Sequence, residues 1–365
     1  MAKRAEDQVR GRGAQSALVP QRFGLAQREA DGDWRDAAEA LDGPPVKLRT
    51  TVTEEFPKTI LSFNSSPDIP FDRSINAYRG CEHGCVYCFA RPTHAYHDLS
   101  PGLDFETKLF AKPDAARLLT ETLAKPGYKP QWIAMGTNTD PYQPIENRYR
   151  ITRQVLEICL DARHPVTITT KSDRVLRDLD ILSEMARRRL VAVSISVTSL
   201  DPKLSGLLEP RAAAPMKRLA ALGTLAKAGV PTHCSVSPVI PAITDEFMES
   251  IIERAGSLGV HSAGWIPLRL PHEVAPLFRE WLSVHYPDRA GKVMSIVRSI
   301  RSKDGAGRDN DPDFFTRMKP SGVWADLLRT RFRIACKKAG IGSGKLELDC
   351  SAFRRPETGG QMRLL

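Results

Sequence analysis

The chain has 365 residues, 41% of them hydrophobic, which is enough for one large domain with extensions or for two domains. No apolar run reaches the roughly 18 residues of a membrane span, and the charged start MAKRAEDQVRGRG has no apolar stretch behind it, so we expect neither a membrane anchor nor a secretory signal. Most of the net charge of +10 lies in residues 289–365, which hold 17 basic and 8 acidic side chains. A basic appendage on a neutral core suits a polyanionic partner, and it equally suits a solvated helix face.

The first segment, residues 1–57, is rich in Arg, Gly, Ala, Asp and Gln and contains the breaker run Gly43-Pro44-Pro45, so we expect it to be poorly ordered. Strand-like and helix-like stretches then alternate, which predicts a parallel sheet with right-handed crossovers in a core domain at 58–271. The expected strands are 73–78, 131–135, 165–170, 190–197, 231–236 and 261–266. The expected helices are 113–124, 150–162, 173–188, 215–228 and 244–257.

Three of these strands alternate polar and apolar side chains with period two. Strands that helices cover on both faces normally read apolar throughout. Polar rows turned to one side would line a wet lumen, which favours a barrel that holds a ligand over a doubly wound sheet. The polar rows are Thr167, Thr169 and Lys171; Ser194, Ser196 and Thr198; and His233, Ser235 and Ser237.

The most informative motif is the loop with Cys81, Cys85 and Cys88, spaced C-x3-C-x2-C. Seven cysteines, an odd number with three inside eight residues, favour metal ligation in a reducing cytoplasm over a disulfide framework. Three thiolates can bind three irons of a cubane cluster and leave the fourth iron open to an outside chelator. The alternative is a zinc site completed by one of the nearby histidines, His83, His94 or His97.

The cysteine spacing, with Tyr87 and Phe89 around the third cysteine, resembles that of the radical S-adenosylmethionine (SAM) superfamily. The resemblance implies an α/β fold, an open six-stranded partial (βα) barrel, with a [4Fe–4S] cluster on Cys81, Cys85 and Cys88 and with SAM on the open iron. The reduced cluster would cleave SAM to methionine and a 5′-deoxyadenosyl radical. A reductant of the flavodoxin or ferredoxin type would supply the electron.

The same resemblance implies a set of SAM-binding residues at the carboxyl ends of the strands, where barrels bind ligands. The loop after the second strand would contact the SAM amino group, a lysine the carboxylate, serines the carboxylate or ribose, and a glutamate the ribose hydroxyls. These residues are Tyr87, Gly136, Thr137, Asn138, Thr139, Asp140, Lys171, Ser194, Ser196, Glu209 and Arg211.

Over residues 70–270 the chain is similar to the spore photoproduct lyase-like group, often labelled DNA repair photolyase. Established members of that group reverse a thymine dimer in DNA, and the lyase returns a hydrogen atom from a cysteine just after the second strand. Residues 131–148 contain no cysteine here. We expect Cys159 and Cys234 in the core, and Cys350 could fold back over the barrel mouth.

Residues 272–365 are predicted to form a basic extension of helices followed by a short strand. Basic residues interleaved with aromatics can hold the phosphates and stack the bases of DNA or RNA. The extension could also be a lid that shields the radical, or a packing helix with a charged outer face. The basic groups are Arg298, Arg301, Lys303 and Arg308, and then Arg329, Arg331, Arg333, Lys337 and Lys338 around Trp324 and Phe332.

The sequence therefore predicts a cytoplasmic radical SAM enzyme whose substrate is unidentified, with a nucleic acid and a lyase-type reaction as one candidate. The alternative is a non-enzymatic nucleic-acid-binding protein with a structural zinc or iron–sulfur site. Modification of a protein or peptide by the same radical is a third possibility.

Overall fold

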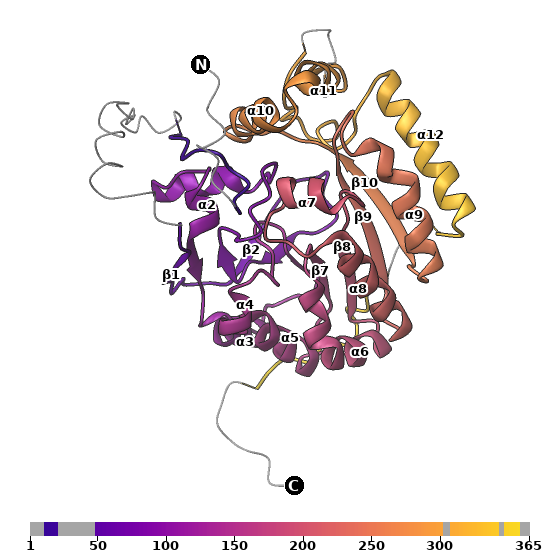
Figure 1. Cartoon of the computed structure of the whole chain (residues 1–365). Helices are drawn as coiled ribbons and strands as arrows, with labels where there is room; N and C mark the ends of the chain where they lie inside the picture. Colours follow the sequence, from indigo (N-terminus) through magenta and orange to yellow (C-terminus); the bar gives the residue numbers. More distant parts are fainter. Residues whose placement is uncertain (1–10, 21–47, 302–306, 343–346, 358–365) are drawn as a thin grey trace.

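The computed structural model describes residues 11–20, 48–301, 307–342 and 347–357 (Figure 1). Within these residues the main element is a seven-stranded sheet in the order β10-β9-β8-β7-β6-β3-β2. Strands β3 to β10 of this sheet run parallel, and β2 pairs antiparallel with β3 at one edge. The strands are β2 (Leu61–Phe63), β3 (Arg73–Ile75), β6 (Ile133–Met135), β7 (Val166–Thr170), β8 (Val191–Ser196), β9 (Thr232–Val239) and β10 (Ser262–Pro267).

Helices follow the parallel strands and cover the outer face of the sheet, as Figure 1 shows. The predicted α/β partial barrel of six alternating strands is therefore confirmed. The main covering helices are α3 (Ala115–Ala124), α5 (Ile151–Asp161), α6 (Leu179–Arg187), α8 (Pro215–Lys227) and α9 (Met248–Ser257). Shorter helices are η3 (Arg91–His97), α2 (Asp104–Thr107), α4 (Glu146–Tyr149), η4 (Asp173–Asp178), α7 (Pro202–Leu208) and η5 (Asp245–Phe247).

The polar rows of β7, β8 and β9 lie on the face of the sheet away from these helices. The strand register places Thr169, Ser194 and His233 side by side, and all three are partly or fully exposed. The alternate positions, such as Ile168 and Val193, are fully buried in the core that the helices close. The period-two pattern thus divides each strand between a packed outer face and a polar lumen.

A second, smaller sheet has the order β1-β5-β4 and comprises β1 (Thr51–Glu54), β5 (Lys108–Ala111) and β4 (Tyr78–Arg79). The prediction of a poorly ordered segment at 1–57 is wrong for residues 51–54, because they form β1 and pair in parallel with β5. Nothing local in the sequence signals this strand, since its partner lies more than fifty residues further on. Residues 1–10 and 21–47 of that prediction lie outside the described residues.

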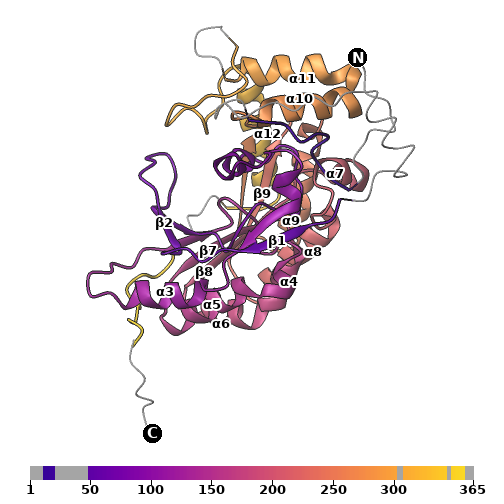
Figure 2. The ribbon, with the colours of Figure 1, turned by 90° about the vertical axis from the view of Figure 1, so that its left-hand side faces the viewer.

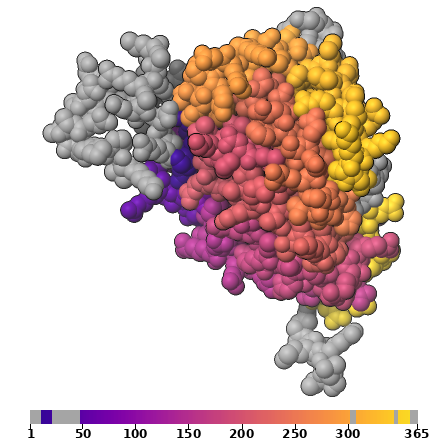
Figure 3. Space-filling view, turned by 45° about the vertical axis from the view of Figure 1, so that its right-hand side comes forward, coloured from indigo at the N-terminus to yellow at the C-terminus, as the bar shows by residue number. Residues whose placement is uncertain are grey.

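The C-terminal extension contains α10 (Val274–His285), α11 (Pro287–Ser299) and α12 (Val323–Lys338). Helix α12 packs along the outside of α9, and the space-filling view shows its yellow residues against the orange ones (Figure 3). The predicted final strand is wrong for residues 347–357, which have no regular structure. None of the helices in the described part of the chain is both long and apolar enough to cross a membrane.

Candidate cofactor site

The loop with the three cysteines follows β4 and lies at the carboxyl end of β3. All three cysteines are free; Cys81 and Cys85 are buried and Cys88 is partly buried. Gly84 has a positive φ of 67°, which a side chain would strain. The backbone N–H of Cys81 donates to the Phe105 carbonyl oxygen at 2.9 Å, so the loop is pinned to its surroundings as well as curled.

Arg91 organises this loop from inside the protein. Its guanidinium is fully buried and donates to the carbonyl oxygens of Gly84 at 3.2 Å and Cys85 at 2.9 Å. It also forms an ion pair with the buried carboxylate of Glu106, so its charge is compensated. Sequence reasoning missed both residues, because neither stands in a pattern that predicts burial.

The three thiols are chemically suited to a cationic cluster. Burial raises the pKa of each of them, and the negative charges of Asp140 and of the neighbouring thiols raise that of Cys81 further. Three thiolates at this place would be costly without nearby positive charge, which bound irons supply. Cys81, Cys85 and Cys88 therefore fit three ligands of a cluster.

The histidines that could complete a zinc site each make another contact, and Nδ1 of His94 has no hydrogen-bond partner among the described residues. His83 lies 3.2 Å from Asp140 through its Nδ1, and Nε2 of His94 lies 2.8 Å from the Lys108 carbonyl oxygen. The His97 ring packs on Phe110. Over residues 11–20, 48–301, 307–342 and 347–357, no three His, Cys, Asp or Glu side chains are arranged to hold a single metal ion.

The loop after β6 holds the cysteine loop directly. The Thr139 hydroxyl donates to the Gly80 carbonyl oxygen at 2.6 Å, and Gln143 donates to the same oxygen at 3.2 Å. The Gln143 side-chain oxygen in turn accepts from the backbone N–H of Glu82 at 2.9 Å. Gln143 was not among the predicted residues, although it stands in the same motif.

Asp140 and Asn76 fix the loop after β6 to the neighbouring strands. The Asp140 carboxylate accepts from the Thr170 hydroxyl and from the Lys171 backbone N–H, both at 2.7 Å. The Asn76 side chain accepts from the Asn138 backbone at 2.9 Å and contacts the Thr137 hydroxyl at 3.1 Å. Asp140, one of the predicted SAM-binding residues, therefore stabilises the loop after β6 through contacts inside the protein.

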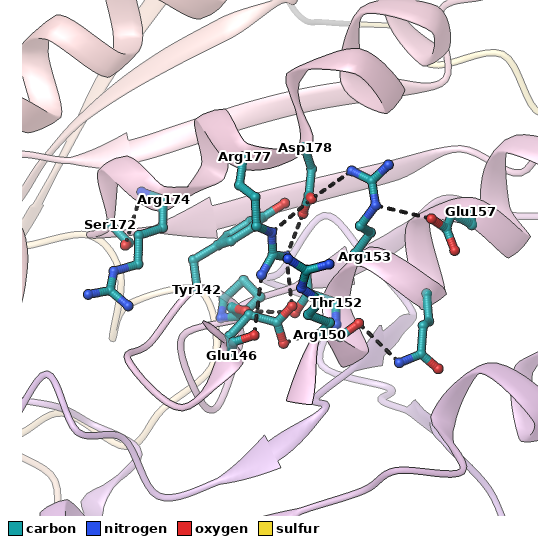
Figure 4. Close-up of polar contacts among 12 residues, drawn as sticks. Tyr142, Glu146, Arg150, Thr152, Arg153, Glu157, Ser172, Arg174, Arg177 and Asp178 are labelled. Atoms are coloured by element: carbon teal, nitrogen blue, oxygen red, sulfur yellow. Dashed lines mark hydrogen bonds and ion pairs between the residues drawn. The ribbon is translucent and has the colours of Figure 1, made fainter. Parts of the chain in front are cut away.

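A buried polar network supports the same loop from behind, as Figure 4 shows. The Glu146 carboxylate accepts from the Tyr78 hydroxyl and from the Thr152 backbone at 3.1 Å, and pairs with Arg177 at 2.8 Å. Arg177 also pairs with the buried Asp178 at 2.8 Å. The loop is thus held on both sides before any ligand binds, which is the rigidity that a binding site requires.

Tyr87, Lys171 and Glu209 come together beside Cys85. The Glu209 carboxylate accepts from the hydroxyls of Tyr87 and, at 2.7 Å, Thr198, and it lies 3.4 Å from the Lys171 ammonium. It also pairs with Arg218, a fully buried residue on α8 that no sequence pattern singles out. Burial alone would raise the pKa of Glu209, but the two cations lower it well below its ordinary value, so the carboxylate is ionised.

The other predicted SAM-binding residues do not join one cluster. Ser194 is partly exposed in the lumen and Ser196 lies two residues further along β8, where it is buried. Arg211 is exposed and pairs at 3.0 Å with Glu82 of the cysteine loop. The structure therefore brings Arg211 to the outer side of that loop.

Residues 11–20 cross the cysteine loop, and we call them the N-terminal strap. The backbone N–H groups of Gly13 and Ala14 donate to the Glu106 carboxylate at 3.0 and 2.8 Å. A Cβ on Gly13 would lie 1.7 Å from the Gly84 carbonyl oxygen, so the two backbones are in direct contact. At its other end the Ser16 hydroxyl donates to Glu280 of α10 at 2.7 Å.

Helices α10 and α11 cover the loop on another side. Cys85 and Val86 belong to a second hydrophobic core that includes Phe278 and Trp281 of α10 and Val293 of α11. The Trp281 indole N–H donates to the Leu207 carbonyl oxygen at 3.1 Å, which ties α10 to α7. The first part of the extension therefore covers one side of the cysteine loop with apolar side chains.

Helix α12 uses one residue of its basic cluster and its two aromatic rings in packing. Arg331 makes a two-pronged ion pair with Glu249 at 2.6 and 2.8 Å. Trp324 and Phe332 pack against the main hydrophobic core. These contacts match the packing-helix interpretation for one side of the helix. The other basic residues are exposed, namely Arg329, Arg333, Lys337 and Lys338.

Comparison with known proteins identifies the relatives of this chain. Residues 75–255 match the family model described as the Radical SAM superfamily. An uncharacterized protein of Mycobacterium tuberculosis is 34% identical over 232 residues, which cover 63% of this chain and 68% of the relative. An uncharacterized protein of Methanocaldococcus jannaschii is 29% identical over 241 residues, covering 63% of this chain and 86% of the relative.

Solved structures of spore photoproduct lyase share the fold. The lyase complexed with dinucleoside spore photoproduct superposes with a TM-score of 0.54 at 16% identity over 79% of each chain. A mutant of the lyase gives 0.56 at 15% identity, covering 86% of this chain and 84% of the other. The chain belongs to the radical SAM superfamily, whose members use a [4Fe–4S] cluster and SAM as cofactors.

Proposed function

We propose that this protein cleaves SAM reductively and uses the 5′-deoxyadenosyl radical to abstract a hydrogen atom from a nucleic-acid substrate. The observation that carries the proposal is the set of three free thiols, Cys81, Cys85 and Cys88, on one loop at the carboxyl ends of strands around a polar lumen. When bound, the cluster supplies the electron for SAM cleavage, and an external reductant of the flavodoxin or ferredoxin type reduces it.

The chain's own residues would bind and orient SAM. Thr137 and Asn138 stand on a loop that Asn76 and Asp140 hold rigid, which suits acceptors for the SAM ammonium. Lys171 stands 3.2 Å from the Ser237 carbonyl oxygen and can turn toward a carboxylate near Ser194.

Glu209 already has four partners without SAM. We therefore assign it first to positioning Tyr87 and Lys171 through its hydrogen bond and its ion pair. Direct contact between Glu209 and the ribose stays a prediction, as do the SAM contacts of Gly136, Thr139, Asp140, Ser196 and Arg211.

Two observations support a nucleic acid as the substrate. The fold is shared with spore photoproduct lyase, which was solved with a dinucleoside photoproduct, and residues 289–365 are strongly basic. A lyase-type reaction in the cytoplasm is the form we propose. With no cysteine in residues 131–148, and with Cys159 and Cys234 fully buried, the group that returns hydrogen to the product must differ from that of the lyase.

The cofactor part of the proposal is tested by anaerobic reconstitution with iron and sulfide, followed by reduction in the presence of SAM. We expect brown protein that releases 5′-deoxyadenosine, and we expect Cys85→Ala to lose both properties. Cys336→Ser, on the outer helix α12, is the matched control and should retain them. Colourless protein that holds one zinc would contradict the proposal and favour a structural metal site.

The substrate is tested by untargeted comparison of nucleic acids and metabolites from cells that carry the wild-type protein or Cys85→Ala. A modified nucleotide that accumulates in the variant supports the proposal. A difference confined to peptides or proteins would contradict the nucleic-acid part and leave SAM cleavage intact.

A further inference from the structure

A surface with two phenylalanines and charged residues of both signs spans the gap between the two edges of the open sheet. The sheet order makes β2 and β10 the edges. Asp68, in the loop between β2 and β3, pairs with Arg317 of the extension through two contacts of 2.7 Å. Arg301 in turn donates to the Arg317 carbonyl oxygen at 2.6 Å and to the Leu268 carbonyl oxygen just after β10 at 2.9 Å. Figure 2 shows the β2–β3 loop rising toward the orange extension.

Two neighbouring phenylalanines project from this surface. Phe314 is 51% exposed and Phe315 is 55% exposed. Phe315 has φ of 67°, a strained value for a bulky residue that persists only where its surroundings enforce it. Asp68 lies against this turn, because its carboxylate binds the Arg317 side chain two residues further on. The Arg317 guanidinium lies 4.8 Å from the centroid of the Phe314 ring, which leaves the rest of that ring and the Phe315 ring open to solvent.

Arg269 lies beside Arg317 and is only partly compensated by the carboxylates of Asp68 and Asp311. Its Nε is buried without a hydrogen-bond partner among the described residues, and its Nη1 contacts only the weak acceptor Sδ of Met318 at 3.1 Å. Burial, and then the nearby Arg317, lower the pKa of this guanidinium. No carboxylate of residues 48–301, 307–342 or 347–357 forms an ion pair with it. Asp68 and Asp311 offset less of the cost than burial and Arg317 impose, so a bound anion would stabilise this half-buried guanidinium further.

We name Arg269, Phe314, Phe315 and Arg317 the Phe–Arg patch, which the buried Arg301 supports from beneath, and we propose that it binds single-stranded DNA. Arg269 would hold a phosphodiester, and Phe314 and Phe315 would stack on unpaired bases. This inference rests on the proposed function and deepens it, because it names the surface that brings the substrate to the open side of the barrel. Helix α12 keeps exposed basic residues, but its two aromatic rings are packed, so it could hold phosphates without stacking bases.

The test measures binding of a fluorescent single-stranded DNA of about 16 nucleotides, the upper site size of one compact binding module, by anisotropy with reconstituted full-length protein. We expect Phe314→Ala and Phe315→Gly each to weaken binding at least about fivefold, the lower limit for one lost stacked base. Glycine accepts a positive φ, so Phe315→Gly should weaken binding without lowering the melting temperature. Arg269→Gln should weaken binding. It should also reduce the slope of log affinity against log salt concentration by about one.

Three variants are matched controls and should bind as the wild type does. Phe56→Ala removes another exposed phenylalanine, 65% exposed, Lys217→Gln removes a charge on α8, and Arg333→Gln removes a charge on the exposed face of α12. Retained visible absorbance of the cluster shows that each protein is folded.

Several results would overturn the inference. Wild-type affinity in all patch variants would show that the Phe–Arg patch does not bind DNA. The proposed function would be unaffected. A loss confined to Arg333→Gln would move the interface to α12, and tighter binding of RNA of the same sequence would make DNA the wrong occupant. If the wild-type protein binds no oligonucleotide, the proposal of a nucleic-acid substrate is also wrong. Release of 5′-deoxyadenosine from the same sample tests the radical chemistry separately.

Discussion

At the scale of single residues, Gly136 shows how closely the site is built. It has φ of 87°, and a Cβ there would lie 2.1 Å from the Thr169 carbonyl oxygen. We expect Gly136→Ala to lower the free energy of unfolding by at least about 2 kcal/mol, because backbone strain and steric overlap add.

The control is Gly206→Ala, in a helix with open space around the new methyl group. This variant should raise the free energy of unfolding by about 0.5–1 kcal/mol. Urea unfolding of the cluster-free proteins measures both, and equal effects would refute the close approach.

Glu209 makes the stability of the fold depend on pH. Its pKa is depressed in the folded protein, so its contribution is fully present above its ordinary pKa of about 4.3 and is lost as the pH falls toward the lower folded value. Glu209→Gln should remove this dependence and lower the free energy of unfolding at pH 7 by about 3–5 kcal/mol, because Arg218 is left buried and unpaired.

Urea unfolding across the acid range checks the Glu209 prediction. The control is Glu121→Gln, an exposed carboxylate on α3, which should change the free energy of unfolding by less than about 0.5 kcal/mol. If the free energy of unfolding of Glu209→Gln falls with decreasing pH as steeply as that of the wild type, other groups govern the pH dependence.

At the scale of elements, the N-terminal strap and α10 enclose the cysteine loop. Gly13→Ala forces the strap away from Gly84, because its new Cβ would overlap the Gly84 carbonyl oxygen. We expect the cluster of this variant to bleach severalfold faster in air, since water and oxygen reach the loop more easily. The decay of the visible absorbance measures the effect. Gly127→Ala, where the added methyl meets nothing within 4 Å, is the control and should bleach at the wild-type rate.

At the scale of the whole molecule, the last described segment lies opposite the site. The Asp349 backbone donates to the Arg189 carbonyl oxygen and that of Arg354 donates to the Ala162 carbonyl oxygen, so residues 349–354 cross the amino ends of β7 and β8. The expectation that Cys350 could reach the barrel mouth is therefore wrong. Its position depends on these two distant backbone contacts, which the local sequence does not encode.

Cys350→Ser should leave both cluster content and 5′-deoxyadenosine release at wild-type levels, because the thiol is separated from the site by the length of the barrel. Iron analysis and chromatography of the reduced reaction measure the two quantities, with Cys88→Ser as the variant expected to lose both. A Cys350→Ser protein that cleaves SAM but forms no product would instead give this thiol a catalytic role.

Much of the fold was predictable because its signals are local. The alternation of polar and apolar residues in β7, β8 and β9 and the helix periods between them place each element within a few residues. The chain position of Cys81, Cys85 and Cys88 predicts the cofactor class, since ligand spacing within one loop is itself a local property. The candidate residues Tyr87, Lys171 and Glu209 could be selected by their places at strand ends, although their mutual contacts could not.

The sequence by itself determined the barrel, the three-thiol loop and the superfamily, because each depends on residues that are near one another in the chain. Only the tertiary structure decided that β1 pairs with β5, that the N-terminal strap lies on Gly84, that Arg218 compensates Glu209, and that Phe314 rather than Trp324 is exposed. Each of these joins segments far apart in sequence or depends on which side chains the remaining chain leaves uncovered. Such contacts arise from packing the whole molecule, and no short stretch of sequence carries them.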